Sequence, residues 1–327
     1  MSAGILLTGA SGFVGQALLR ACLERQEYVL CPVRQALSQQ HSLLESREFT
    51  GLSPEFDWSG WFNDIDCVIH SAARVHVMKE KVADPLAAFR EMNVAATLNL
   101  ARQAGHAGVK QFMFISSIKV NGEMTTQQPF RADDAVAPQD PYAISKYEAE
   151  QGLLEVAAET GMAITIIRPP LIYGPGVKAN FLSLMKAVKR GLPLPLGAIQ
   201  NKRSLVYLGN LVSLILCCLR NPSAYNQVFL AADGVDLSTP QLIREIAQAM
   251  RRSPRLLSIP PGLLIFAGSV LGKRAALERL CGSLQVDPRK AQHVLGWRAP
   301  YTPQQGLAAT VAPLLPVLEN SEIYDQA

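Results

Sequence analysis

Short apolar runs alternate with segments of helical period through the first half of the chain. Runs of a few consecutive apolar residues, bounded by turn residues, are typical of parallel strands that are buried on both faces. Five runs have this form, at residues 5–7, 28–33, 67–69, 112–115 and 164–167. A weaker strand is expected at residues 48–52, ahead of the turn residues Ser53 and Pro54.

The segments between these runs carry apolar side chains at helical spacing. Residues 13–25 place Val14, Leu18 and Cys22 on one stripe, and residues 89–104 form a second segment with a helical pattern. Repeated strand–helix–strand units predict an α/β fold with a doubly wound parallel (Rossmann) sheet and right-handed crossovers.

The residue composition changes after the last of these strands. Proline and glycine crowd together at residues 169–176, and a helical segment is expected at residues 180–190. We therefore predict a dinucleotide-binding Rossmann domain at residues 1–168 and a smaller C-terminal α/β substrate domain at residues 169–327. Two later apolar stretches, at residues 205–219 and 229–230, have a pattern compatible with packing back against the sheet of the first domain.

Composition narrows the class of protein. The 327 residues carry a net charge of only +4, which suits a binder of small anions and argues against nucleic acid as a partner. Six cysteines without a Cys-x-x-Cys pair are typical of a reducing compartment. The chain runs directly into its first strand, with no room for a signal peptide, so we expect a cytoplasmic protein.

One apolar stretch has no obvious place in this scheme. Residues 260–272 are apolar enough to form a lid, a partner surface or part of the core. The stretch is too short to span a bilayer, and a buried helix is expected there rather than a membrane-associated one.

The turn after the first strand has the form of a phosphate site. Gly9, Gly12 and Gly15 allow a sharp turn and a close approach of the backbone to a pyrophosphate at the N-terminus of the first helix. Arg34 follows the second strand, where an NAD-selective enzyme carries an acid, and no carboxylate occurs before Glu45. Arg34 therefore favours NADP, with NAD as the alternative.

A tyrosine and a lysine are spaced for proton transfer. Asp140 and Pro141 are predicted to open a helix that places Tyr142 and Lys146 on one face, where the ammonium favours the phenolate. The strand at residues 112–115 ends in two serines, and hydroxyls at that sheet edge are placed to bond a ligand oxygen.

These motifs together resemble the extended short-chain dehydrogenases/reductases, the NAD-dependent epimerase/dehydratase family. The resemblance covers nearly the whole chain. It rests on the glycines at 9–15, on Ser117, and on the Tyr142 and Lys146 pair. Further similar segments are 68–73, 93–94, 168–176 and 295–297.

The resemblance implies a role for each matching residue. Tyr142 would donate or accept the proton, Lys146 would lower its pKa and bond the nicotinamide ribose, and Ser117 would orient the substrate. The implied cofactor residues are Gly9, Ser11, Gly12, Phe13, Val14, Gly15, Arg34, Ala72, Ala73, Asn93, Ser116, Tyr142, Lys146 and Pro169. The implied substrate residues are Arg74, Ser117, Lys119, Asn180 and Arg203, the last two beside a nucleotide diphosphate. No metal is expected.

Two enzyme functions and one non-enzymatic function remain open. The blocks at 73–78, 117–122 and 176–181 look like bacterial enzymes that reduce UDP-4-keto-6-deoxy-N-acetylhexosamines for surface polysaccharide such as O-antigen. With Arg34, they favour an NADP-dependent 4-ketoreductase of a nucleotide sugar. The alternatives are an NAD-dependent UDP-hexose or N-acetylhexosamine 4-epimerase and a redox-inactive dinucleotide sensor. A homodimer through the helices near 84–105 and 142–159 is expected by the same resemblance.

Two histidines lie at or just after the strand at residues 67–69. His70 is expected to be a satisfied core histidine, whereas Arg74 and His76 follow the strand where substrate or cofactor phosphate should lie.

Overall fold

A seven-stranded parallel sheet forms the larger part of the molecule. The computed structural model describes residues 4–75, 84–270, 272 and 274–315. The strand order is β3-β2-β1-β4-β5-β6-β9, and every neighbouring pair runs parallel. The strands are β1 (Gly4–Thr8), β2 (Val29–Val33), β3 (Leu44–Glu48), β4 (Ile65–His70), β5 (Gln111–Ile115), β6 (Ala163–Arg168) and β9 (Gln227–Leu230).

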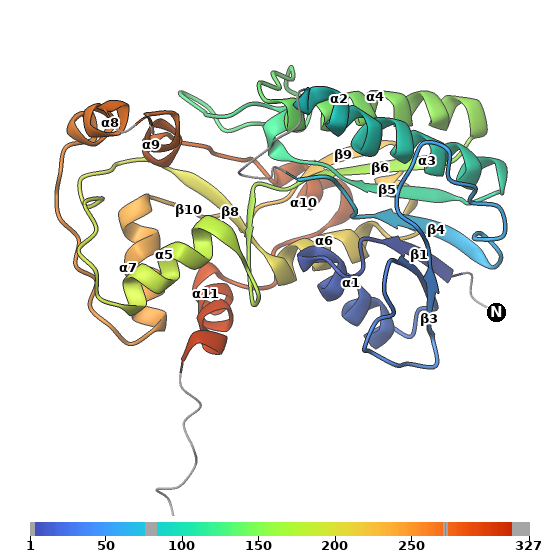
Figure 1. Ribbon diagram of the computed structural model, residues 1–327, viewed down its shortest axis with the longest axis horizontal. Coiled ribbons are helices and arrows are strands. Elements are labelled where there is room, and N and C mark those ends of the chain that lie inside the picture. Colours follow the sequence, from blue (N-terminus) through green and yellow to red (C-terminus); the bar gives the residue numbers. More distant parts are fainter. Residues whose placement is uncertain (1–3, 76–83, 271, 273, 316–327) are drawn as a thin grey trace, which may run out of the picture.

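Helices cover both faces of this sheet (Figure 1). One face carries α1 (Phe13–Glu24), α6 (Leu208–Cys218) and α10 (Arg289–Leu295). The other carries α3 (Ala96–His106) and α4 (Pro141–Thr160), with the short α2 (Pro85–Phe89) beside α4. Successive strand residues point to opposite faces, so Ile5 and Leu7 pack in one core and Leu6 in the other. The predicted doubly wound Rossmann sheet is confirmed.

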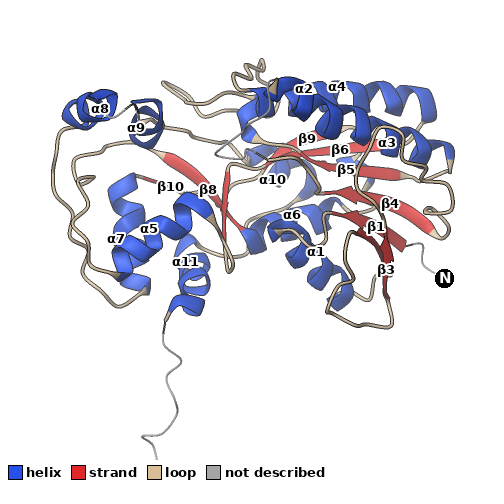
Figure 2. Ribbon diagram, viewed as in Figure 1, coloured by secondary structure: helices blue, strands red, loops and turns tan. Residues whose placement is uncertain are grey.

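A smaller lobe is built on a three-stranded sheet (Figure 2). β7 (Leu171–Tyr173) and β10 (Asp236–Leu237) flank β8 (Arg203–Tyr207), with β7 parallel and β10 antiparallel to it. Its helices α5 (Ala179–Lys189), α7 (Thr239–Ala249) and α11 (Pro303–Val311) share a separate hydrophobic core around Tyr173, Phe181 and Ile243.

Two further helices, α8 (Pro261–Val270) and α9 (Arg274–Cys281), pack on each other at one end of the molecule (Figure 1). Short helical turns complete the described chain, at Ile118–Val120, Pro222–Ala224 and Ala312–Leu314. In the described ranges no helix is both long and apolar enough to cross a membrane.

Three expectations about elements need correction. The weak strand predicted at 48–52 lies earlier, at Leu44–Glu48, where register with β2 pairs Leu44 with Val29. The helix predicted at 89–104 is divided, because a π-helical turn at Arg90–Ala95 separates α2 from α3. The helix predicted to be buried at 260–272 is α8, and most of its side chains are exposed.

The chain after residue 168 serves both lobes. α6 packs on α1 beneath the large sheet, and β9 pairs with β6 from Thr165↔Gln227 to Arg168↔Leu230. The two stretches expected to return to the first sheet therefore contribute a helix and a strand to its packing, while the division at residue 168 stays a prediction.

Candidate active site

The turn after β1 forms a cradle of three glycines. Gly9 has a φ of +75°, and the N–H of Gly12 donates to the Gly9 carbonyl at 2.8 Å. A Cβ at Gly9 would lie 2.7 Å from the Ala72 nitrogen, and one at Gly15 would lie 1.9 Å from the Gly9 oxygen. A side chain is therefore excluded at both positions. A dinucleotide diphosphate fits this cradle, because the free N–H groups and the dipole at the start of α1 favour an anion.

The loop after β4 lies against the cradle. Ser71 Oγ donates to the Thr8 carbonyl at 2.7 Å, and the N–H of Ala72 donates to Thr8 Oγ1 at 3.4 Å. These bonds bring Ala72, followed by Ala73, next to Gly9. The remaining predicted cofactor residues of the glycine turn lie at its tip and in the first turn of α1: Ser11, Phe13 and Val14.

Asn93 is buried in the π-helical turn and holds the same loop. Its Oδ1 accepts from the N–H of Arg74 at 2.8 Å, and its Nδ2 donates to the Arg74 carbonyl and to Ser145 Oγ, each at 3.1 Å. The Arg74 guanidinium lies 5.8 Å from the centroid of the Phe89 ring. Asn93 therefore fixes the loop after β4 relative to α4.

Arg34 lies exposed just beyond β2, as the sequence predicts. The first carboxylate that follows Arg34 in the sequence, Glu45, is already bonded to Tyr28 Oη at 2.6 Å and to Arg47 at 2.7 Å. A second acid was missed: exposed Glu48 is in register with Val33, so it lies at the same sheet edge as Arg34. Only the pairing of β2 with β3 reveals this position, because the two segments are separated in sequence.

The predicted proton-transfer helix begins where the sequence places it. Asp140 caps α4 by accepting from the N–H of Ala143 at 2.7 Å, and Pro141 is its first residue. Buried Lys146 donates from Nζ to the Ile115 carbonyl at 2.8 Å and lies 4.2 Å from the centroid of the Phe114 ring. These contacts fix α4 to the carboxyl end of β5, the end at which Ser116 and Ser117 follow.

Burial shifts the pKa values of both Tyr142 and Lys146. Burial, and then the charge of Asp140, raise the pKa of Tyr142 to about 12. Burial lowers the pKa of Lys146 to about 7, against an opposing effect of Glu150. Desolvation of the phenol dominates this shift of the Tyr142 pKa, and the lowering of that pKa by Lys146 stays a prediction.

Ser116 points into a buried ion pair instead of standing free. Its Oγ donates to Glu150 at 2.5 Å, and Glu150 also accepts from Arg168 at 3.0 and 2.5 Å. Arg168 Nη1 donates to Asn121 Oδ1 at 3.0 Å. Sequence reasoning missed this network, although Glu150 repeats the helical spacing of Tyr142 and Lys146, which was an available signal.

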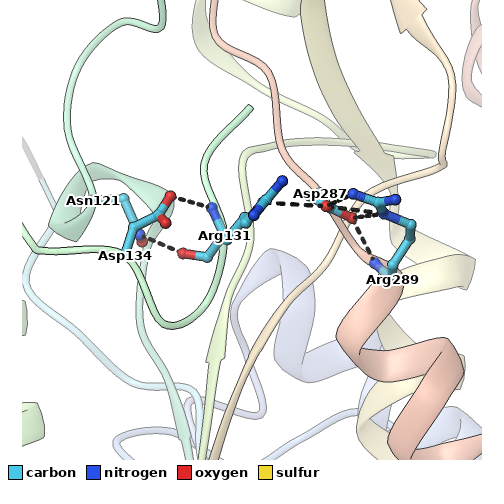
Figure 3. Close-up of polar contacts among 5 residues, drawn as sticks. All are labelled: Asn121, Arg131, Asp134, Asp287 and Arg289. Atoms are coloured by element: carbon cyan, nitrogen blue, oxygen red, sulfur yellow. Dashed lines mark hydrogen bonds and ion pairs between the residues drawn. The ribbon is translucent and has the colours of Figure 1, made fainter. Parts of the chain in front are cut away.

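The network continues outwards through Asn121 (Figure 3). Asn121 Nδ2 donates to the Arg131 carbonyl at 3.0 Å, and the N–H of Arg131 donates to Asp134 at 2.7 Å. The Asp287 carboxylate lies between the guanidinium groups of Arg131, at 3.9 Å, and Arg289, at 2.5 Å. The loop after β5 is thereby attached to the segment that precedes α10.

The predicted substrate residues fall in two groups. Lys119 forms ion pairs with Glu123, at 3.0 Å, and with Asp140, so it lies at the start of α4. Asn180 and Arg203 belong to the small lobe: Asn180 is exposed in the first turn of α5, and Arg203 Nη1 donates to the Arg279 carbonyl at 2.7 Å. Within the described part of the chain, neither Asn180 nor Arg203 forms a hydrogen bond or ion pair with Ser117, Tyr142 or Lys146. The loop carrying Ser117 does meet Pro169, whose carbonyl accepts from the N–H of Ile118 at 3.0 Å.

His70 is the satisfied core histidine that the sequence predicts. Its Nδ1 lies 2.8 Å from Thr8 Oγ1 and its Nε2 lies 3.1 Å from Thr97 Oγ1. Burial, and then the charge of Lys146, lower its pKa to about 3, so the ring is neutral. His76 lies outside the described residues. Among the described side chains, no group of three or more His, Cys, Asp or Glu is placed to hold a metal ion.

Known proteins resemble this chain over nearly its whole length. The chain is 45% identical over 318 residues to UDP-glucose 4-epimerase of Vibrio cholerae, with 96% of each covered. It is 30% identical over 328 residues to the N-acetyl-alpha-D-glucosaminyl-diphospho-ditrans,octacis-undecaprenol 4-epimerase of Escherichia coli O157:H7, with 95% of each covered.

One solved structure shares the fold of this chain, and one family profile matches its sequence. UDP-glucuronic acid 4-epimerase from Bacillus cereus, solved in complex with NAD, has the same fold, with a TM-score of 0.74 at 20% identity. The match covers 94% of this chain and 95% of that one. The profile of the NAD dependent epimerase/dehydratase family matches residues 5–231. This protein, with its Rossmann sheet and glycine cradle, therefore belongs to the NAD dependent epimerase/dehydratase family.

Proposed function

We propose that the chain is an NAD-dependent 4-epimerase of a sugar 1-diphosphate, with a UDP-hexose or UDP-N-acetylhexosamine as its substrate. The 45% identity to a UDP-glucose 4-epimerase across almost the whole of both chains carries this proposal. The name of the second relative describes inversion at the same sugar carbon on a different carrier, undecaprenol diphosphate. Inversion at C4 and a diphosphate are common to both names, and they define the substrate class.

The residues around the end of β5 are suited to the proton transfers of this reaction. Tyr142 Oη takes the proton of the C4 hydroxyl and later returns it, while Ser117 holds the sugar oxygen. The bound NAD supplies the hydride acceptor and donor. Burial raises the pKa of Tyr142 to about 12, so a positive charge must stabilise its phenolate, and Lys146 is the cation on the same helix face.

The remaining site residues bind the cofactor or the substrate diphosphate, or they orient neighbouring groups. Gly9, Gly12 and Gly15 receive the dinucleotide diphosphate, and Ala72 lies beside them. Asn93 and Ser116 act through other groups, since their side chains are bonded to Arg74, Ser145 and Glu150. Asn180 and Arg203 are the proposed ligands of the substrate diphosphate, for which an arginine fork is well suited.

A reductase that consumes NADPH is the second candidate, and exposed Arg34 at the end of β2 favours it. The two reactions differ in their use of cofactor. An epimerase recovers its cofactor in every turnover, whereas a reductase needs one NADPH for each product molecule.

The first experiment therefore follows sugar and cofactor together. Purified protein is incubated with UDP-glucose or UDP-N-acetylglucosamine, the C4 epimer is measured by NMR, and the dinucleotide released on denaturation is identified. Epimer formed without added cofactor, with NAD released and no effect of Arg34→Ala, is the expected result. Net oxidation of NADPH by a 4-keto sugar nucleotide, lost with Arg34→Ala, would establish the reductase instead.

Tyr142→Phe tests the proton transfer. We expect kcat to fall by roughly 10²–10⁴-fold, because a positioned acid–base group contributes about that much, while NAD still binds. Epimerisation kinetics and a direct titration of NAD measure the two effects. Equal behaviour of wild type and variant would remove Tyr142 from the mechanism and would favour the redox-inactive sensor.

A further inference from the structure

Lys119, a predicted substrate residue, has both its backbone and its side chain bonded within the protein. Its N–H donates to Ser117 Oγ at 3.3 Å, at the start of the short turn Ile118–Val120. Its ammonium donates to Asp140 and, at 3.0 Å, to Glu123. Burial alone would lower the pKa of Lys119, but these two bonds raise it, so the side chain stays charged. The cation that follows Ser117 is therefore already neutralised by two carboxylates.

The bond from Lys119 to Asp140 joins the loop after β5 to the start of α4. Asp140 Oδ1 accepts from the N–H of Ala143 at 2.7 Å, while Oδ2 accepts from the ammonium. One carboxylate thus caps the helix that carries Tyr142 and anchors the turn that begins at Ser117. The Lys119 and Asp140 side chains are only 34% and 31% exposed, so water screens this pair less than it screens a pair at the surface.

The bond from Lys119 to Glu123 extends to the small lobe. The Glu123 side chain is 14% exposed, and the next residue, Met124, lies so close to Gly282 that a Cβ there would be 2.6 Å from Met124 Sδ. The Gly282 carbonyl accepts at 3.3 Å from Arg203, the proposed diphosphate ligand. Burial lowers the pKa of Arg203, and the charge of Glu123 opposes this effect. Glu123 therefore lies where the loop after β5 meets the support of Arg203.

We propose that Lys119 is a positioning residue, which fixes Ser117 relative to Tyr142 and to the small lobe instead of binding the substrate. Because Ser117 Oγ accepts from the N–H of Lys119, its hydroxyl proton is available for the sugar oxygen on which Tyr142 acts. A shift of about 1 Å between the two hydroxyls would lower the rate by up to about 10²-fold.

This role rests on the proposed function, in which Ser117 and Tyr142 contact the same sugar. It serves the reductase, the second candidate, equally well, because that reaction also moves a proton through the tyrosine. The positioning role can therefore be measured on whichever of the two reactions the protein performs.

The test compares kcat and KM of the NAD-bound protein with its UDP-sugar, together with the Kd of UDP. Lys119→Met removes both ion pairs, and we expect kcat to fall roughly 10–100-fold while KM and the Kd of UDP change less than about threefold. Lys119→Arg should recover most of kcat, since a guanidinium can bond both carboxylates. The opposite pattern, with KM and the Kd of UDP raised and kcat kept, would make Lys119 a ligand and overturn the proposal.

Asp140→Asn separates the ion pair from the helix cap, because asparagine caps a helix about as well as aspartate does. It should lower kcat, and the double variant with Lys119→Met should match Lys119→Met alone within about twofold. Losses that add in the double variant would show that Lys119 does not act through Asp140, and would also overturn the proposal.

Glu148→Gln is the matched control, because it removes another ion pair of α4, with Arg90 at 2.5 Å, about two turns beyond Asp140. Its kcat should equal that of the wild type. A control that loses kcat as Lys119→Met does would make a general loosening of α4 the cause. Neither epimerisation nor NADPH oxidation by the wild type would overturn the proposed function and this role with it, whereas a Lys119→Met variant as active as a working wild type would overturn the positioning role alone.

Discussion

At the scale of single residues, the buried carboxylate of Glu150 connects α4 to the carboxyl ends of two strands of the large sheet. It accepts from Ser116, at the end of β5, and from Arg168, at the end of β6. The two charged side chains are only 1% and 5% exposed. An ion pair taken out of water in this way is held together by its mutual bonds, because either partner alone would be an unpaired buried charge.

Glu150→Gln should therefore destabilise the protein strongly. We expect a loss of about 3–5 kcal/mol in the free energy of unfolding, measured by urea denaturation, because Arg168 keeps its charge without a counterion. The matched control is Glu148→Gln, which breaks the exposed pair with Arg90 and should cost less than about 1 kcal/mol. Similar losses of unfolding free energy in both variants would show that burial of the ion pair does not determine how much its removal destabilises the protein.

His70 should make stability depend on pH. Its pKa is lowered to about 3 in the folded protein, whereas an unfolded chain takes up the proton near its ordinary value of 6.5. The unfolded state thus gains protons first as the pH falls, and folding loses about 1.4 kcal/mol for each pH unit between these values.

The comparison of His70→Gln with wild type isolates this effect. The stability advantage of the wild type at pH 7 should shrink as unfolding is measured at pH 6 and then pH 5. A constant difference over this range would mean that His70 does not bind the proton differently in the two states.

At the scale of elements, prediction from sequence succeeded where local pattern decides the structure. The start of α4 at Pro141 follows from Asp140 and Pro141 alone, and the glycine turn follows from its spacing. β3 was misplaced because its sequence, LESRE, is polar at an edge of the sheet, and only pairing with β2 defines it. The Glu150–Arg168 pair also required tertiary structure, since its partners come from different elements.

Gly15→Ala tests the close contact between β1 and α1. The added Cβ would meet the Gly9 oxygen at 1.9 Å, so α1 must move away from the glycine turn. We expect NAD binding to be lost and stability to fall by about 1–3 kcal/mol or more. Isothermal titration and thermal unfolding measure the two effects.

Gly262→Ala is the control for this variant, because a Cβ there would meet nothing within 4 Å. It should bind NAD normally and change stability by no more than about 1 kcal/mol, in the favourable direction expected for alanine in a helix. Normal NAD binding by Gly15→Ala would contradict the role given to the cradle.

At the scale of the whole molecule, the helices predicted to form a dimer lie side by side on one face (Figure 1). Leu154 on α4 is 42% exposed there, and an ion pair between Arg102 and Glu159 joins α3 to α4. Contacts within one chain therefore already hold α3 and α4 together. The homodimer stays a prediction.

Leu154→Arg should separate the predicted dimer, because it places a charge in an apolar contact repeated by symmetry. We expect its dimer dissociation constant to rise at least about tenfold, measured by light scattering after size exclusion. Val294→Arg, on α10, should have no effect. If the wild type is monomeric even at high concentration, this face does not bind a second copy of the chain.

The return of β9 to the large sheet has a consequence for how the protein is made. β6 leaves the ribosome with one side unpaired, and its partner follows only after the strands and helix that build much of the small lobe. Until then the nascent chain presents an open sheet edge and an α1 face without α6, both of which invite association with other chains. The N-terminal half is thus not a module that could be exchanged between proteins by a single cut. A gene fusion or truncation that removes residues 208–230 would be expected to yield insoluble protein even though every glycine of the cradle and the entire α4 helix remain.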